Sequence, residues 1–156
     1  MKVLVISDSH GHIVNLKTIA EIAIKSKIDA IVHAGDWNNI ESVKTILDSG
    51  IPLYTVLGNA DIKDGMDEFL KLNTKGFNPD FLKIEIDGRK IGIIHKAKAI
   101  DKRFEGLDIV FSGHYHSKEE KMRDFIKFIR PGAIINGINF AVYETVSGRV
   151  KFVQDV

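Results

Sequence analysis

The sequence contains no cysteine, and this absence removes several classes of protein from consideration. Disulfide-stapled folds, thiol catalysis and zinc–thiolate sites all require cysteine. A chain of 156 residues can bury roughly 70% of the surface of its unfolded state, so it needs no such staples. We therefore expect one domain spanning residues 1–156, stabilised by its hydrophobic core.

An excess of charge of either sign is also missing. The chain has 22 Lys and Arg against 21 Asp and Glu, which gives a formal net charge of +1. A protein that coats nucleic acid or binds anionic membranes usually has a polycationic surface. The composition therefore does not support nucleic acid as a partner.

Long hydrophobic runs are absent as well. The apolar run at residues 3–6 is too short for a signal peptide, and no small-residue cleavage site follows it. No stretch approaches the roughly 20 apolar residues of a membrane-spanning helix. We expect a cytoplasmic protein with no membrane partner, and the sequence leaves room for an oligomer.

The first 58 residues alternate between two hydrophobic patterns. Short, β-branched runs at residues 3–6, 28–33 and 53–57 are typical of strands that are buried on both faces. Between them, apolar residues recur at helical spacing over residues 16–23 and 40–47. This β-α-β-α-β order favours a parallel sheet with right-handed crossovers.

The helical pattern fades after residue 60. We expect irregular structure over residues 60–80 and, at most, a turn or two of helix within residues 118–126. Further strands are expected at residues 82–86, 90–95, 107–112, 125–129, 138–146 and 149–153. Two mixed β-sheets packed face to face, with helices outside, would bury these runs. The predicted fold class is α/β, a four-layer α-β-β-α sandwich.

All six histidines lie in polar segments that end or follow predicted strands. These segments are residues 7–12, 33–36, 95 and 112–116, and a further polar segment without histidine lies at 58–61. In open α/β sheets, functional residues gather just beyond the carboxyl ends of strands. Side chains at i and i+2 of an extended segment point the same way, so Asp8 and His10 can share one ion. Imidazoles and carboxylates without thiolates suit Mn, Fe, Co, Ni or Zn better than Ca.

Taken in order, these segments resemble the motifs of the calcineurin-like metallophosphoesterases. The motifs D-x-H, G-D, G-N-x-[DE], a lone His and G-H-x-H are matched by Asp8-Ser9-His10, Gly35-Asp36, Gly58-Asn59-Ala60-Asp61, His95 and Gly113-His114-Tyr115-His116. Each motif alone is weak, but five in order, each after a predicted strand, are a strong signal. The small size and the G-N-x-D form look most like the compact archaeal and bacterial phosphodiesterases.

The resemblance implies a centre with two divalent metal ions. One ion would be bound by Asp8, His10, Asp36 and His116, and the other by Asp36, Asn59, His95 and His114. Asp36 would bridge them, and Mn²⁺ is favoured, with Ni²⁺, Co²⁺, Fe²⁺ and Zn²⁺ as alternatives. Two close ions lower the pKa of a shared water and clamp both oxygens of an in-line displacement. The implied reaction is hydrolysis by a bridging hydroxide, with Asn59 and His114 as catalytic residues.

Two positions depart from the family pattern. Many members have a histidine that assists the leaving group where this chain has Ala60, and His12 is a candidate to contact substrate in its place. The lone histidine is usually followed by glycine, whereas His95 is followed by Lys96, which could contact a phosphate or remain solvated. His12 and Lys96 are therefore our candidate substrate-binding residues.

Two other polar residues near the motifs have structural interpretations. We expect His33 to pack or to support a ligand residue rather than to bind metal. We expect Asp61 to orient a ligand residue or to cap a turn.

We predict a metal-dependent phosphodiesterase that acts on a small phosphodiester. Hydrolysis of phosphomonoesters or nucleotides is an alternative, because the metal core would be the same. The chain leaves little room for a cap domain, so an open site is expected. A third interpretation is an interaction module, as in the retromer subunit that resembles this fold. That subunit departs from the ligand set, whereas this chain retains all seven ligands and would be a module with a retained metal site.

Overall fold

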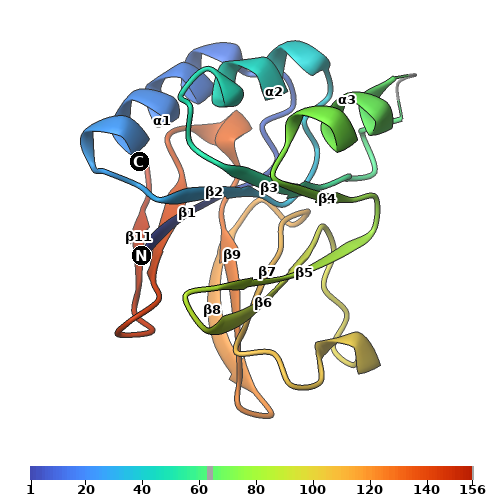
Figure 1. Cartoon of the computed structure of the whole chain (residues 1–156), viewed down its shortest axis with the longest axis vertical. Coiled ribbons are helices and arrows are strands. Elements are labelled where there is room, and N and C mark those ends of the chain that lie inside the picture. The colour runs from blue at the N-terminus through green and yellow to red at the C-terminus, as the bar shows by residue number, and fades with distance from the viewer. Residues whose placement is uncertain (63–64, 156) are drawn as a thin grey trace.

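Two β-sheets with helices on one side form the protein (Figure 1). The computed structural model describes residues 1–62 and 65–155. The strands are β1 (Lys2–Ile6), β2 (Ala30–His33), β3 (Leu53–Val56), β4 (Gly76–Asn78), β5 (Phe81–Ile86), β6 (Arg89–Ile94), β7 (Ile109–Phe111), β8 (Lys118–Arg123), β9 (Ile126–Pro131), β10 (Phe140–Glu144) and β11 (Val150–Val153). The helices are α1 (Ile13–Lys25), α2 (Ile40–Leu47) and α3 (Met66–Asn73), with short 3₁₀ turns η1 (Lys102–Phe104) and η2 (Ile134–Asn136).

The first sheet has six strands in the order β11-β10-β1-β2-β3-β4. Strands β1, β2 and β3 run parallel, as the alternating pattern of the first 58 residues predicts. Strand β4 adds a further parallel strand beside β3, while β10 and β11 join as an antiparallel pair. Because β1, β2 and β3 are parallel, their carboxyl ends reach the same edge of the sheet.

The second sheet has five strands in the order β5-β6-β7-β9-β8. Its central strands β6, β7 and β9 are parallel, and antiparallel hairpins close both edges. The predicted α/β fold with two mixed sheets is therefore confirmed.

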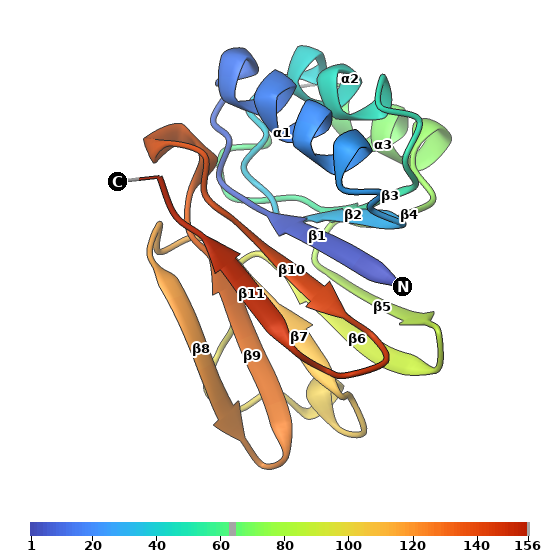
Figure 2. The ribbon, with the colours of Figure 1, turned by 90° about the vertical axis from the view of Figure 1, so that its left-hand side faces the viewer.

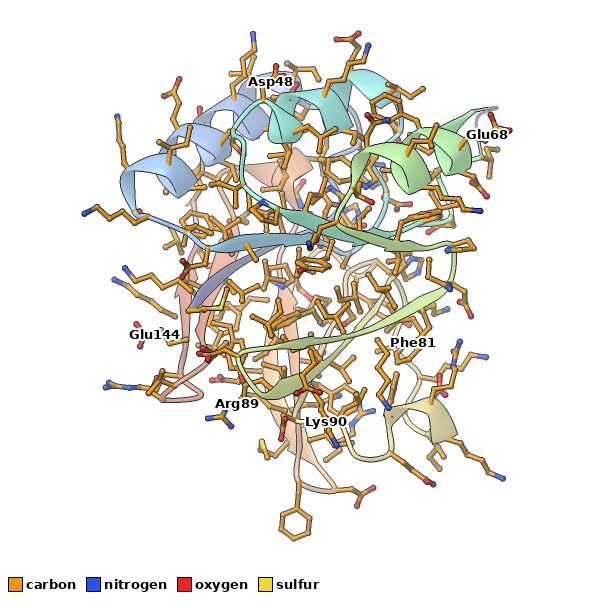
Figure 3. All side chains as sticks on the ribbon, in the orientation of Figure 1. Asp48, Glu68, Phe81, Arg89, Lys90 and Glu144 are labelled. Carbon is orange, nitrogen blue, oxygen red and sulfur yellow. The ribbon has the colours of Figure 1, made fainter. Side chains whose placement is uncertain are left out.

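The helices stack on the first sheet, and the first sheet stacks on the second (Figure 2). Three clusters of apolar side chains hold these layers together. One lies between the helices and the first sheet, where Leu16 of α1 and Ile46 of α2 meet Leu4 and Ile31. The second fills the space between the two sheets, and the third covers the outer face of the second sheet. Charged side chains such as Asp48 and Glu68 point outward from the helices (Figure 3).

The outer layer differs between the two sheets. Helices α1, α2 and α3 all cover the first sheet, whereas the described residues over the second sheet form the single turn η1. Phe104 of η1 and the nearby Leu107 are the main apolar anchors of that segment, which is too short for an amphipathic helix. The outer face of the second sheet is therefore only thinly covered.

Two of the predicted local structures are wrong. Part of the segment 60–80, expected to be irregular, forms α3 and β4, while residues 63–64 lie outside the described structure. Helix α3 has only two turns, and Met66 and Leu70 are its fully buried residues, so its hydrophobic pattern is faint. The segment 118–126, in which we expected at most a turn or two of helix, begins with strand β8. Every residue of β8 pairs with a residue of β9, which keeps this segment extended. Within residues 1–62 and 65–155, no helix is long and apolar enough to cross a membrane.

Candidate metal centre

Loops at the carboxyl ends of five strands meet above the contact between the sheets. Asp8 and His10 follow β1, Asp36 follows β2 and Asn59 follows β3, all in the first sheet. His95 directly follows β6, and His114 and His116 follow β7, in the second sheet. The structure thus brings together all seven of the predicted ligand residues, which are spread over 109 positions of the sequence.

The first group of side chains gathers around Asp8. His116 Nε2 lies 3.4 Å from Asp8 Oδ1, and His10 Nε2 lies 3.8 Å from the same oxygen. The two imidazole Nε2 atoms face one another at 3.3 Å. Asp8, His10 and His116 therefore present three potential ligand atoms to one small space.

The second group gathers around His95. Its Nε2 atom lies 3.0 Å from Asn59 Oδ1 and 3.4 Å from His114 Nδ1. His114 Nδ1 is in turn 3.2 Å from Asn59 Oδ1. These three side chains converge on a second space beside the first.

Asp36 lies between the two groups. Its Oδ2 atom is 3.4 Å from His10 Nε2 and 3.3 Å from His95 Nε2, while Oδ1 accepts a hydrogen bond from the Ala60 N–H at 2.8 Å. Burial, the largest single influence, raises the pKa of Asp36, but the hydrogen bonds from His95 and Ala60 together outweigh it. The pKa of Asp36 is held below its ordinary value, so the carboxyl is ionised at neutral pH.

The arrangement fits divalent cations. Asp8 Oδ1 is fully buried and accepts no hydrogen bond from any described residue, although such an oxygen normally has a partner. Gly58 and Gly113 leave room for the carboxylates, since a Cβ on Gly58 would collide with Asp36 and one on Gly113 would lie 2.5 Å from Asp8 Oδ2. An unpaired buried carboxylate oxygen, surrounded by imidazole nitrogens, is the donor set that transition-metal ions prefer.

Further polar groups fix the orientation of the imidazoles. His95 Nδ1 lies 2.7 Å from the Ala34 carbonyl, so this nitrogen carries a proton and Nε2 is the ring nitrogen that faces the site. His10 Nδ1 lies 3.3 Å from Asn38 Oδ1, which has the same effect. Outer partners of this kind orient histidine ligands at metal sites. Asn38 is a residue that the sequence analysis missed, and the only signal for it was the polar segment that follows Gly35-Asp36.

Asp61 supports the loops and stays outside both groups. Its buried carboxylate accepts hydrogen bonds from the N–H groups of Asp36 at 2.8 Å, Asn38 at 2.8 Å and Gly58 at 2.9 Å. These bonds tie the loop after β3 to the loop after β2. Asp61 therefore positions Asp36, in agreement with the orienting role expected of it.

His33 is buried beneath the site and belongs to its support. Its ring stacks on Trp37 at 3.5 Å between centroids, Nε2 contacts Ser9 Oγ at 3.0 Å, and Nδ1 accepts from the Gly35 N–H at 3.1 Å. Burial lowers the pKa of His33 well below its ordinary value, and the neighbouring His95 lowers it further. His33 is thus a neutral packing residue, as predicted.

The two predicted substrate-binding residues lie at different places on the rim. His12 is the N-cap of α1, and its Nδ1 accepts from the Asn15 N–H at 3.3 Å, so only Nε2 remains for another partner. Lys96 is exposed and lines a hollow of about 280 Å³ with Asn59, His95 and Lys98. Its ammonium lies 5.9 Å from the centre of the Tyr115 ring, a residue to which the sequence analysis assigned no role.

Comparison with known proteins identifies a family and similar folds. The sequence model of the calcineurin-like phosphoesterase superfamily domain matches residues 1–147. Phosphodiesterase MJ0936 of Methanocaldococcus jannaschii is 28% identical over 138 residues, which cover 85% of this chain and 83% of that protein. A solved archaeal phosphodiesterase has a TM-score of 0.86 at 23% identity and covers 98% of this chain and 99% of its own. The phosphoesterase YfcE from E. coli has a TM-score of 0.70 at 16% identity, covering 98% of each chain. By its sequence match over residues 1–147, the chain belongs to the calcineurin-like phosphoesterase superfamily.

Proposed function

We propose that the protein is a phosphodiesterase that depends on divalent metal ions. The observation that carries this proposal is the buried Asp8 Oδ1, which has no partner among the described residues and faces the imidazoles of His10 and His116. Together with Asp36, which lies between this group and His95, it forms a site built for cations. The similarity to a protein named as a phosphodiesterase supports a phosphodiester as the substrate.

The chain offers ligands for two ions. Asp8, His10, Asp36 and His116 would hold one ion, and Asp36, Asn59, His95 and His114 would hold the other, with Mn²⁺ as the favoured metal. When bound, such ions polarise a phosphoryl oxygen and lower the pKa of a water molecule. Asp36 is the proposed bridge, because one of its oxygens faces both groups.

The residues on the open side of the centre would contact the substrate. Asn59 and His116 are exposed and His114 is half-buried, whereas Asp8, Asp36 and His95 are buried. Burial lowers the pKa of His114, and the nearby His95 and Lys96 lower it further, so its ring is neutral at pH 7. A neutral His114 and the Asn59 amide would orient the phosphoryl group. The exposed Lys96 adds a cation at the rim that attracts the phosphate anion.

Ala60 determines how the leaving group departs. Its backbone holds Asp36, and its methyl group provides no proton donor where many family members have an imidazole. A general acid typically contributes about 10²–10⁴-fold to the rate. We therefore expect good turnover only for leaving groups that depart without protonation, such as nitrophenolate, and a steep loss for alkyl groups.

The proposal is tested by comparing a diester with its monoester. The protein is stripped with EDTA, reloaded with Mn²⁺, and assayed with bis(p-nitrophenyl) phosphate and p-nitrophenyl phosphate. The expected result is a higher kcat/KM for the diester, dependent on added metal. Equal or better turnover of the monoester with every metal would overturn the diesterase assignment and leave the metal site intact. Failure to hydrolyse either ester while Mn²⁺ binds would favour the interaction module.

A further inference from the structure

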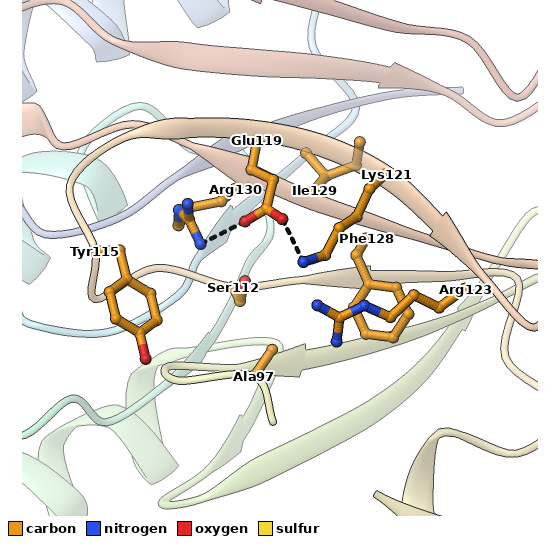
Figure 4. Close-up of a pocket in the computed structure, with 9 residues that line it drawn as sticks. All are labelled: Ala97, Ser112, Tyr115, Glu119, Lys121, Arg123, Phe128, Ile129 and Arg130. Carbon is orange, nitrogen blue, oxygen red and sulfur yellow. Dashed lines mark ion pairs between the residues drawn. The ribbon is translucent and has the colours of Figure 1, made fainter. Parts of the chain in front are cut away.

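A recess next to the metal centre has no role in the proposed chemistry. It has a volume of about 320 Å³ and lies between the hairpin β8–β9 and the loop that carries His114 and His116 (Figure 4). Its lining includes Ser112, Tyr115, Lys121, Arg123, Phe128 and Arg130, and Glu119 lies among these cations.

Successive side chains of β8 point to opposite faces of the second sheet, and those on the outer face line this recess. Glu119, Lys121 and Arg123 occupy every second position of β8 and are less exposed than the residues between them. The register pairs Lys121 with Phe128 and Glu119 with Arg130, so all of these side chains share the outer face of the second sheet. This is the face that helices leave uncovered, so the cations border an open hollow.

The recess carries an excess of positive charge. Glu119 makes ion pairs with Lys121 at 2.6 Å and with Arg130 at 2.7 Å (Figure 4), and these cations hold its pKa below the ordinary value, so it stays ionised. Arg123 has no carboxylate within 4 Å in the described part of the chain and lies over the Phe128 ring at 5.3 Å. Three cations against one carboxylate leave a net charge of about +2.

The donors in the recess are not all occupied. Arg130 is engaged with Glu119 and with the Ser117 carbonyl and hydroxyl, so it anchors the loop. The Lys121 ammonium spends one of its three donors on Glu119, whereas the Arg123 guanidinium makes no ion pair or hydrogen bond with the described residues and lines the hollow (Figure 4). Ser112 is 6% exposed and lines the same hollow, and its hydroxyl makes no hydrogen bond with any residue of the described ranges. A hydroxyl at the bottom of a hollow, with the unpaired Arg123 guanidinium lining the same space, suits a polar, anionic ligand.

Tyr115 connects the recess to the metal centre. It stands between His114 and His116 in the sequence, and its ring lies 4.9 Å from the His114 ring. Its ring is also 5.1 Å from the Arg130 guanidinium. A substrate whose reacting phosphate lies at His114 can therefore extend past Tyr115 into the recess.

We propose that this recess binds a second anionic group of the substrate, so that the preferred phosphodiesters carry an additional phosphate on one arm. Arg123 and Lys121 would donate charge-assisted hydrogen bonds to its oxygens, and Ser112 would donate a further one. The inference rests on the proposed diesterase function. It places the specificity of the enzyme in the β8–β9 hairpin.

The test compares two chromogenic diesters that differ by one phosphate. They are thymidine 5′-(p-nitrophenyl phosphate) and the same compound with a 3′-phosphate, both assayed with the Mn²⁺-loaded protein. The leaving group is the same, so the difference reports on binding of the added anion. We expect kcat/KM to be about tenfold higher for the 3′-phosphorylated substrate, mainly through a lower KM.

Two variants test whether the higher kcat/KM for the 3′-phosphorylated substrate comes from the recess. Arg123→Gln keeps a side chain over Phe128 but removes the charge, and it should bring the ratio of the two kcat/KM values close to one. Lys83→Ala is the matched control, because Lys83 is an exposed cation on β5, the opposite edge strand of the same sheet. It should keep the tenfold ratio. If both variants lower the ratio equally, general charge attraction and not the recess is responsible, and the inference is wrong.

The two proposals fail in different ways. If the wild-type protein hydrolyses both diesters with equal kcat/KM, the recess does not bind the second phosphate, while the diesterase function stands. If neither diester is hydrolysed by the metal-loaded protein, the proposed function itself is wrong.

Discussion

At the scale of single residues, the candidate metal centre is built from strained backbone. Asp8, His10, Asp36, His114 and His116 all have positive φ, between 43° and 76°. Such conformations cost of order 1–3 kcal/mol each for side chains other than glycine. The chain tolerates this cost where the loops turn sharply enough to aim neighbouring side chains at one point.

The two aspartates of this region should respond differently to the same substitution. Asp36→Asn removes the charge between the two groups of ligands, so Mn²⁺ binding at both positions should weaken and turnover should vanish. Asp61→Asn places an amide against three backbone N–H groups, which should cost about 1–3 kcal/mol of stability but only part of the activity. Steady-state kinetics and urea unfolding of both variants measure this. Near-normal turnover of Asp36→Asn at saturating Mn²⁺ would refute its bridging role.

His33 should make the stability of the metal-free protein depend on pH. Its folded-state pKa lies well below the ordinary value of about 6.5, so below pH 6.5 the unfolded chain binds a proton that the folded one excludes. The stability that neutral His33 contributes is thus complete above pH 6.5 and is lost as the pH falls toward the folded-state pKa. The slope of this loss is up to about 1.4 kcal/mol per pH unit.

Urea unfolding in EDTA at pH 7.5, 6.5 and 5.5 tests this for the wild type and for His33→Asn. The variant should be less stable at pH 7.5, because it loses the stack on Trp37. The difference in free energy of unfolding between the wild type and the variant should become smaller as the pH falls. His95 and His114 contribute to the pH dependence of both proteins, so their contributions cancel when the two free energies of unfolding are subtracted. A difference in free energy that stays constant from pH 7.5 to 5.5 would contradict a neutral, buried His33.

The sequence predicts the candidate metal ligands better than it predicts some of the residues around them. Aspartate and histidine at fixed offsets after strands are visible without a structure, and the fold brings all seven together as expected. Asn38 and the recess around Arg123 were not found, because their meaning depends on which distant loop they face. Arg123 lies on β8, whose sequence KEEKMR is typical of a solvated charged segment.

At the scale of elements, buried apolar residues decide which predictions succeed. Strands β1, β2 and β3 are short, mostly apolar runs rich in β-branched residues, so their prediction needs no tertiary information. Helix α3 was missed because its N-cap residue, Gly65, offers no capping side chain, and because the helix buries only Met66 and Leu70 completely. Strand β8 was missed because an edge strand rich in lysine and glutamate has no hydrophobic face of its own.

Helix α3 nevertheless should contribute strongly to stability. Leu70 is 0% exposed whereas Leu72, two residues away on the same helix, is 82% exposed. Leu70→Ala leaves a cavity in the layer between helices and sheet and should cost about 2–5 kcal/mol. Leu72→Ala is the matched control and should stay within about 0.5 kcal/mol of the wild type. Equal destabilisation by both substitutions in urea unfolding would show that α3 does not pack as described.

At the scale of the whole molecule, the metal centre joins the two sheets. The first sheet provides Asp8, His10, Asp36 and Asn59, and the second provides His95, His114 and His116. Away from these polar loops, the sheets are held together by the apolar layer between them and by hydrogen bonds such as those from Arg89 Nε to the Thr145 carbonyl and from Lys127 Nζ to the Gly148 carbonyl. The proposed ligands of each ion come from both sheets, so bound metal would act as a clamp between them.

Metal removal should therefore change global stability as well as activity. A ligand that binds only the folded state stabilises it by RT ln(1 + [L]/Kd), which is about 2.7 kcal/mol at a concentration of 100 Kd. The unfolded chain cannot assemble this site, because its ligands are spread from Asp8 to His116. We expect Mn²⁺ to raise the free energy of unfolding by about this amount and to keep both sheets in one cooperative transition. Asp36→Asn, compared with the wild type at the same Mn²⁺ concentration, should lose most of this increment. A wild-type protein whose unfolding midpoint does not move between EDTA and saturating Mn²⁺ would show that the loops do not form a metal site, since any ion that bound them in the folded state would have to stabilise it.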